Sequence, residues 1–106
     1  MEIKEIQTEM EQGGLTPSRA AELRSIVSGK YARARDEWDT LETFRLKYLN
    51  SLSEEDSEAA KERKWGGTEE GEKWRHWRSQ MKKSELMMNS LGSQIRVAEG
   101  EFKNQI

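Results

Sequence analysis

The chain has no cysteine, one proline and one histidine. The absence of cysteine excludes disulfide bridges and thiolate metal sites. The lone histidine, His76, disfavours a histidine metal centre or a catalytic histidine pair, and we interpret it as a surface residue. No run of about 18 apolar residues occurs, so we expect no membrane-spanning helix. Residues 1–5 lack the pattern of a signal peptide, and the expected location is the cytoplasm.

Apolar residues are also scarce for a chain of 106 residues. The hydrophobic fraction is 33%, below the charged fraction of 36%, and an ordinary globular core needs more apolar residues than this. Four Trp and five Met nevertheless argue against plain disorder. No phosphate-binding glycine loop, nucleophile elbow or paired catalytic acid is visible. We therefore expect a protein that is not an enzyme, with no cofactor and no small-molecule substrate.

Two long helices are predicted from apolar residues that recur alternately three and four positions apart, the spacing of a heptad seam. The first is expected over about 17–51, because Thr16-Pro17 combines a hydroxyl N-cap with proline at the first helical position. Its seam is interrupted by a single charged residue, Arg45. The seam residues are Ala20, Leu23, Val27, Tyr31, Ala34, Trp38, Leu41, Arg45, Tyr48 and Leu52. The second helix is expected over about 68–103, and its seam comprises Trp74, Trp77, Met81, Ser84, Met88, Leu91, Ile95, Ala98 and Phe102.

A helix with one narrow apolar stripe needs a partner, so we expect an all-α fold in which the two seams pair. The predicted architecture is an antiparallel helical hairpin, or short coiled coil, formed by residues 15–106. The connection at about 53–67 is expected to hold a short helix, because an N-cap signal is followed there by acids. Residues 1–14 are expected to form a short N-terminal helical arm that either docks on the hairpin or frays.

The expected pairing register follows from closing the hairpin within this connection. It places Tyr48 opposite Trp77, Ala34 opposite Leu91 and Leu23 opposite Phe102. In several layers a large residue then lies opposite a small one, as interdigitating packing requires.

A two-helix hairpin buries little surface for its length, and several apolar residues flank the seams. We predict that these residues contact a protein partner, with a homodimer as the expected assembly. Trp65, beside Gly66-Gly67, either caps the end of the core or is an exposed anchor for a partner. The predicted protein-interaction residues are Ile26, Phe44, Leu46, Leu49, Trp65, Leu86 and Met87.

Residues 73–83 suggest an alternative, nucleic-acid binding, because they contain five bases and no acid. Aromatic rings interleaved with bases can stack on nucleobases and neutralise phosphates. The structural alternative is that Trp74 and Trp77 are buried in the seam and the bases are solvated. The acidic run from Glu54 to Glu72 matches no calcium-loop pattern, so no metal site is expected. The candidate nucleic-acid contacts are Lys73, Arg75, His76, Arg78, Lys82 and Lys83.

Several segments together resemble small two-helix proteins encoded by tailed bacteriophages and prophages. The segments are Tyr31-Ala32, Lys61-Glu62-Arg63-Lys64-Trp65, Thr68-Glu69-Glu70-Gly71, Leu91, Ile95-Arg96-Val97 and Asn104-Gln105. Such proteins are often encoded near replication and recombination genes and have no assigned activity. The resemblance implies a phage-type accessory protein in the cytoplasm of a bacterial host. On this basis we expect an adaptor or modulator of a host or phage protein.

Overall fold

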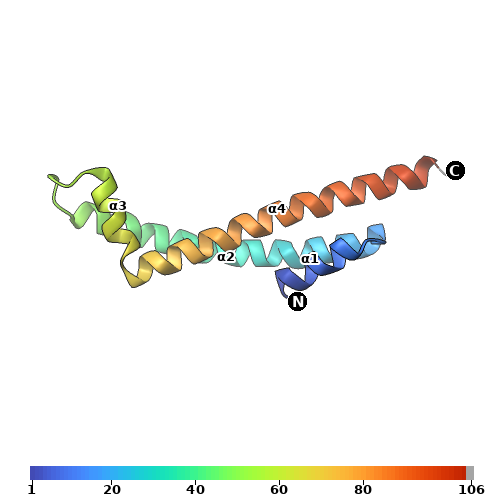
Figure 1. Ribbon diagram of the computed structural model, residues 1–106, viewed down its shortest axis with the longest axis horizontal. Coiled ribbons are helices and arrows are strands. Elements are labelled where there is room, and N and C mark those ends of the chain that lie inside the picture. Colours follow the sequence, from blue (N-terminus) through green and yellow to red (C-terminus); the bar gives the residue numbers. More distant parts are fainter. Residues whose placement is uncertain (105–106) are drawn as a thin grey trace. The chain divides into compact units, whose positions relative to one another are not determined.

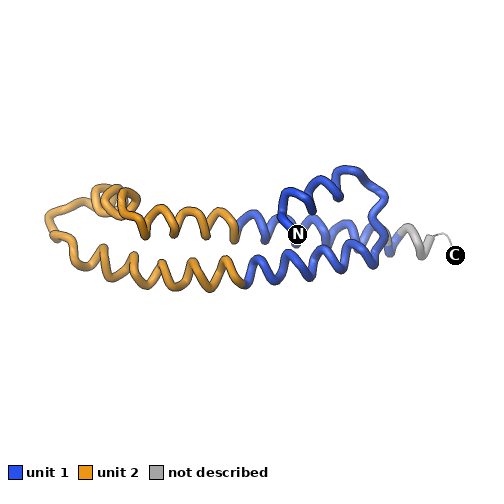
Figure 2. Tube along the Cα trace, turned by 90° about the horizontal axis from the view of Figure 1, so that it is seen from below, with its two compact units in different colours: residues 1–32, 82–106 blue, residues 33–81 orange. Residues whose placement is uncertain are grey.

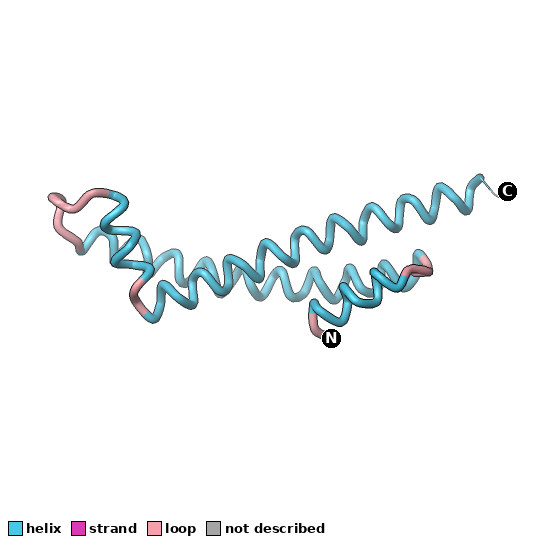
Figure 3. Tube along the Cα trace, in the orientation of Figure 1, coloured by secondary structure: helices cyan, strands magenta, loops and turns pink. Residues whose placement is uncertain are grey.

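The computed structural model describes the backbone of residues 1–104 and the side chains of residues 1–97, 99 and 100. Over this range the chain is helical and contains no strand (Figures 1 and 3). The long helices α2 and α4 pack against each other, as expected for a helical hairpin. Two shorter helices, α1 and α3, are also present, so the described chain has two long and two short helices. The bounds are Ile3–Gln12 for α1, Pro17–Ser51 for α2, Glu58–Gly66 for α3 and Glu69–Asn104 for α4.

The chain divides into two compact units, and α2 and α4 each contribute one part to both (Figure 2). Unit 1 consists of Met1–Ala32 and Lys82–Ile106, and therefore includes α1. Unit 2 consists of Arg33–Met81 and includes α3.

Short-range signals in the sequence fix where the helices begin. Thr16 accepts a hydrogen bond from the backbone N–H of Arg19 at 3.1 Å, which caps the start of α2. Ser57 and Thr68 do the same for α3 and α4, accepting from the N–H groups of Ala60 at 3.1 Å and Gly71 at 2.9 Å. The chain leaves α1 through Gly13 and Gly14, whose φ angles of 75° and 73° lie in the left-handed region that glycine tolerates.

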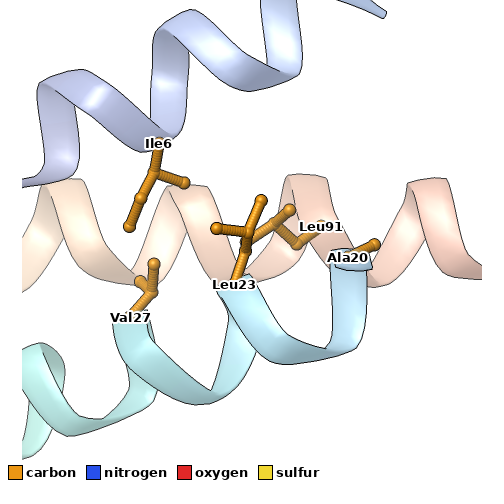
Figure 4. Close-up of a cluster of buried hydrophobic side chains, with 5 residues drawn as sticks. All are labelled: Ile6, Ala20, Leu23, Val27 and Leu91. Carbon is orange, nitrogen blue, oxygen red and sulfur yellow. The ribbon is translucent and has the colours of Figure 1, made fainter. Parts of the chain in front are cut away.

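The core of unit 1 forms where α1 covers α2 and α4 (Figure 4). Ile6 of α1 points towards Leu23 and Val27 of α2 and is fully buried, as is Leu91 of α4. Burying an Ile or Leu side chain stabilises the folded state by about 1.5–3 kcal/mol. The N-terminal arm, for which the sequence left docking and fraying open, is therefore docked.

The core of unit 2 is built mainly from aromatic rings. The Trp65 ring of α3 lies 5.7 Å from the Tyr48 ring of α2 and 6.5 Å from the Trp74 ring of α4, centroid to centroid. Trp38 contacts Trp74 in the same way at 6.3 Å. Ala34 and Leu41 are also buried in this unit. Aromatic contacts of this kind favour tilted or edge-to-face geometry, which these pairs adopt.

The pairing register expected from the sequence is wrong. Leu91 packs with Leu23 and Val27 rather than opposite Ala34, and Trp77 lies under the guanidinium of Arg33 at 5.5 Å rather than opposite Tyr48. The cause is α3, because it packs against the end of α2 and occupies the place assigned to the first turns of α4. The predicted seam residues Ala98 and Phe102 lie outside the described side chains.

Candidate interaction surfaces

Unit 1 contains a groove between α1 and α4 with a volume of about 490 Å³. Apolar side chains line much of it, and the two charged residues in its lining, Glu11 and Lys83, have opposite signs. Glu11 accepts a hydrogen bond from Gln7 at 3.4 Å. The lining residues are Ile3, Gln7, Met10 and Glu11 from α1, and Lys83, Leu86, Met87, Ser90 and Gln94 from α4.

Leu86 is the most exposed large apolar residue among the described residues, with 68% of its surface accessible to solvent. It lies on the lining of the groove, whereas Met87 is half-buried and packs against the core of unit 1. Val97, at 61% exposed, follows Leu86 by eleven residues, which is close to three helical turns. Leu86 and Val97 therefore lie on the same side of α4, and both are available for contact.

The other apolar residues predicted to bind a partner do not form one surface. Phe44 and Leu46 are both exposed. Residues two positions apart in an α-helix point in directions that differ by about 200°, so these two side chains lie on opposite sides of α2. Ile26 is exposed in unit 1, and Leu49 is partly buried in unit 2. Of the two alternatives for Trp65, the exposed anchor is wrong, since its side chain is 3% exposed and packs on the Tyr48 ring within the core, as the capping alternative requires.

Arg45, the charged residue in the predicted seam of α2, joins three elements of unit 2. Its guanidinium donates to Glu42 at 2.8 Å and also pairs with Glu62 of α3. It lies 5.4 Å from the centroid of the Trp74 ring, and the Trp74 Nε1–H donates to the other oxygen of Glu42 at 2.6 Å. Desolvation opposes the charge on Arg45, but the bonds to Glu62 and Glu42 outweigh it and raise the Arg45 pKa. The arginine therefore packs in the core because its charge is compensated there.

Not every polar group in this core is compensated. The Nε1 atoms of Trp38 and Trp65 and the Nε of Arg45 are buried without a hydrogen-bond partner among the described residues. Such groups lower stability, because each loses its hydration without regaining a bond.

The basic segment, residues 73–83, has solvated basic side chains, as expected if these residues flank a buried seam. All six candidate contacts for nucleic acid, Lys73, Arg75, His76, Arg78, Lys82 and Lys83, are exposed. The first four belong to unit 2, and the two remaining lysines belong to unit 1. Lys73 lies 3.5 Å from Glu69, and Arg75 donates to the carbonyl of Gly66 at 3.1 Å.

The aromatic rings of this segment are already in contact with cations of the chain. The guanidinium of Arg78 lies 5.3 Å from the centroid of the half-buried Trp74 ring, on which Arg45 also lies. Trp77 is half-buried under Arg33, and the His76 ring lies 5.1 Å from it, centroid to centroid, in a T-shaped arrangement. The rings therefore have little free face on which a nucleobase could stack.

Over the described residues, no helix is both long and apolar enough to cross a membrane. In the same part of the chain, no group of three or more His, Cys, Asp or Glu is placed to hold a metal ion. Comparisons of the chain with protein-family models, with curated proteins and with solved structures found no match.

Sequence reasoning missed the α1–α4 groove as a site. The sequence predicts a short helical arm over residues 1–14 and marks Leu86 and Met87 on α4 as interaction residues. It does not bring the arm and these residues together, because it leaves the docking of α1 open. Val97 is not among the predicted interaction residues, although its spacing of eleven residues from Leu86 is visible in the sequence.

Proposed function

We propose that this protein is a non-enzymatic interaction protein that presents helical faces to a protein partner. The observation that carries the proposal is the groove of unit 1, where Leu86 is 68% exposed beside the apolar side chains of Ile3 and Met10. A small protein gains about 1.5–3 kcal/mol for each such side chain that it fully buries. A partner that covers this surface would bury these side chains, and the resulting complex would gain that stabilisation.

The proposed setting is the cytoplasm of a bacterial cell, and the candidate partners are host or phage proteins. This part of the proposal rests on the resemblance to small phage-encoded helical proteins described above. The resemblance therefore indicates that a bacterial host lysate is the right source of a partner.

The test is capture of a partner from a bacterial host lysate by tagged full-length protein and by its Leu86→Asp variant. We expect a protein that the wild type retains and Leu86→Asp loses, because a charge in the groove opposes apolar docking. The matched control is Asn89→Asp, which adds the same charge to α4 beside Arg24 and outside the groove. Circular dichroism should show equal helix content in all three proteins. Equal capture by wild type and Leu86→Asp would contradict the proposal.

Nucleic-acid binding is the second candidate, and the exposure of all six basic-segment residues favours it. Since Trp74 and Trp77 already contact arginines, such binding would rely on phosphate contacts rather than on base stacking.

Titration of labelled single- and double-stranded DNA at several salt concentrations separates the two candidates. Phosphate contacts would give an affinity that falls steeply with salt, and Arg75→Gln and Arg78→Gln would reduce the slope. The leading proposal expects no binding even at low salt.

A further inference from the structure

We propose that the occupant of the α1–α4 groove is a second copy of this chain, docked by two-fold symmetry with Lys83 of each copy facing Glu11 of the other. This inference rests on the proposed function and names its partner. It follows from the direction of the two helices, from the placement of the charges and from the exposure of Leu86.

The two helices that form the groove run in the same direction. The chain reverses between α1 and α2 at Gly13-Gly14, and α2 is antiparallel to α4 (Figure 1). Ile6 of α1 packs at the level of Leu91 of α4. Ile3 therefore lies near the Lys83 end of the groove, and Glu11 lies near the Gln94 end.

The charges of the groove are thus separated along its length. Lys83 and Gln94 are eleven residues apart, which corresponds to about 16 Å along α4. Lys83 marks one end with a positive charge, and Glu11 marks the other with a negative charge. Neither residue has an ion-pair partner within 4.0 Å among the described residues.

This polarity selects an antiparallel second copy over a parallel one. A two-fold axis through the middle of the groove, near Gln7 and Ser90, exchanges the ends, so each Lys83 meets the partner's Glu11. The same operation lays Leu86 and Ile3 of one copy over the partner's Met10. A parallel copy would instead place lysine beside lysine and glutamate beside glutamate.

The experiment measures the mass of the full-length protein in solution by light scattering or sedimentation, over micromolar to submillimolar concentrations. The expected mass is twice the 12.4 kDa of the chain, and Leu86→Asp is expected to give the monomer mass. Since Leu86 is exposed, this variant should keep its fold, which circular dichroism checks. Phe44→Asp is the matched control, because Phe44 is an exposed apolar residue on α2 in unit 2 and should leave the dimer intact.

Charge reversal tests the orientation and does not depend on Leu86→Asp. Lys83→Glu or Glu11→Lys alone should each weaken the dimer at least about tenfold, because each places like charges together. The double variant Lys83→Glu/Glu11→Lys should return to the wild-type affinity. Single and double variants that are equally weak would overturn the proposed pairing.

Three further results would overturn the inference. They are a monomer mass for the wild type at all concentrations, a dimer that survives Leu86→Asp, and a dimer lost in Phe44→Asp. A monomeric wild type that still captures a different protein through Leu86 would overturn this inference and leave the proposed function standing. A dimer with the expected charge coupling but no other partner would support the inference and limit the proposed function to self-association.

Discussion

Arg19 of α2 donates two hydrogen bonds to the Glu9 carboxylate of α1, from Nε to Oε1 at 2.7 Å and from Nη2 to Oε2 at 3.0 Å. Arg19 also pairs with Glu22, one helical turn further along α2, at 3.0 Å. The contact joins α1 to α2 at the end of α1 that precedes Gly13-Gly14. Together with the buried Ile6, it explains why a ten-residue helix that is marginal alone is held in place.

Acid should loosen α1. The hydrogen bonds from Arg19 lower the Glu9 pKa below its ordinary value of 4.5, partial desolvation opposes them, and the Arg19 charge adds to the lowering. The stabilisation from this pair is therefore complete above pH 4.5 and is lost as the pH falls through the lower folded-state pKa. Hydrogen-exchange protection of the α1 amides should decrease over that range.

The matched control for this prediction is Glu9→Gln, which keeps the side-chain shape and removes the titration. We expect α1 to be less protected in this variant at neutral pH, and the acid-dependent change to be smaller than in the wild type. An identical acid response in both proteins would assign the effect to other carboxylates.

Ile6→Ala should destabilise unit 1. The side chain is fully buried between α2 and α4, and removing a buried isoleucine to alanine costs about 2–5 kcal/mol. Chemical denaturation followed by circular dichroism measures the change. Thr8→Ala is the control, since Thr8 is exposed on the same helix and its substitution should stay within about 0.5 kcal/mol. Equal stability of the two variants would contradict the docked position of α1.

The long helices were predictable from the sequence because their signals are local and repeated. Thr16-Pro17 marks the start of α2 by capping chemistry alone, and the three-and-four spacing of apolar residues marks its buried side. The pairing register was not predictable in this way, because it depends on the path of the chain between Leu52 and Thr68. That path is set by tertiary contacts, chiefly the Trp65 ring with Tyr48 and Trp74.

The candidate site was predictable only in part for the same reason. Leu86 is recognisable as an apolar residue outside the seam, but the groove beside it exists only when α1 is docked. Arg45 is a second example. The sequence marks it only as a charged residue that interrupts the apolar seam of α2. Its acceptors Glu42 and Glu62 become visible only when α2 and α3 meet.

Two glycine-to-alanine substitutions should have opposite effects. A Cβ atom at Gly71 would lie 2.0 Å from the carbonyl oxygen of Trp65, so the junction of α3 and α4 must shift. We expect Gly71→Ala to lower the free energy of unfolding by about 1–3 kcal/mol. A Cβ at Gly29, within α2, meets nothing within 4 Å, and alanine there should stabilise the helix by about 0.5–1 kcal/mol.

Thermal and chemical unfolding of the two glycine variants and the wild type measure both effects under identical conditions. Gly29→Ala serves as the control for Gly71→Ala, because both add one methyl group to a long helix. A neutral or stabilising Gly71→Ala would mean that Trp65 and Gly71 do not approach as closely as described.

Removing the Glu42 carboxylate should destabilise unit 2. Glu42→Ala deprives the Trp74 Nε1–H of its acceptor and leaves Arg45 with Glu62 as its acidic partner. A fully buried donor without an acceptor costs about 1–3 kcal/mol, and the half-buried Trp74 should cost less than the upper end of this range. Glu42→Gln is the matched comparison and should cost less, because its amide oxygen can still accept from Trp74 while its charge is lost.

The same network predicts that the effects of Glu42 and Arg45 are coupled. Arg45→Met removes the charge that Glu42 compensates and fills part of its volume with an apolar side chain, so the double variant should lose less stability than the two single losses added together. Urea unfolding of the four proteins measures this coupling. Additive losses would show that the two residues act independently, and would contradict the central place of the Glu42–Arg45 pair in the aromatic core of unit 2.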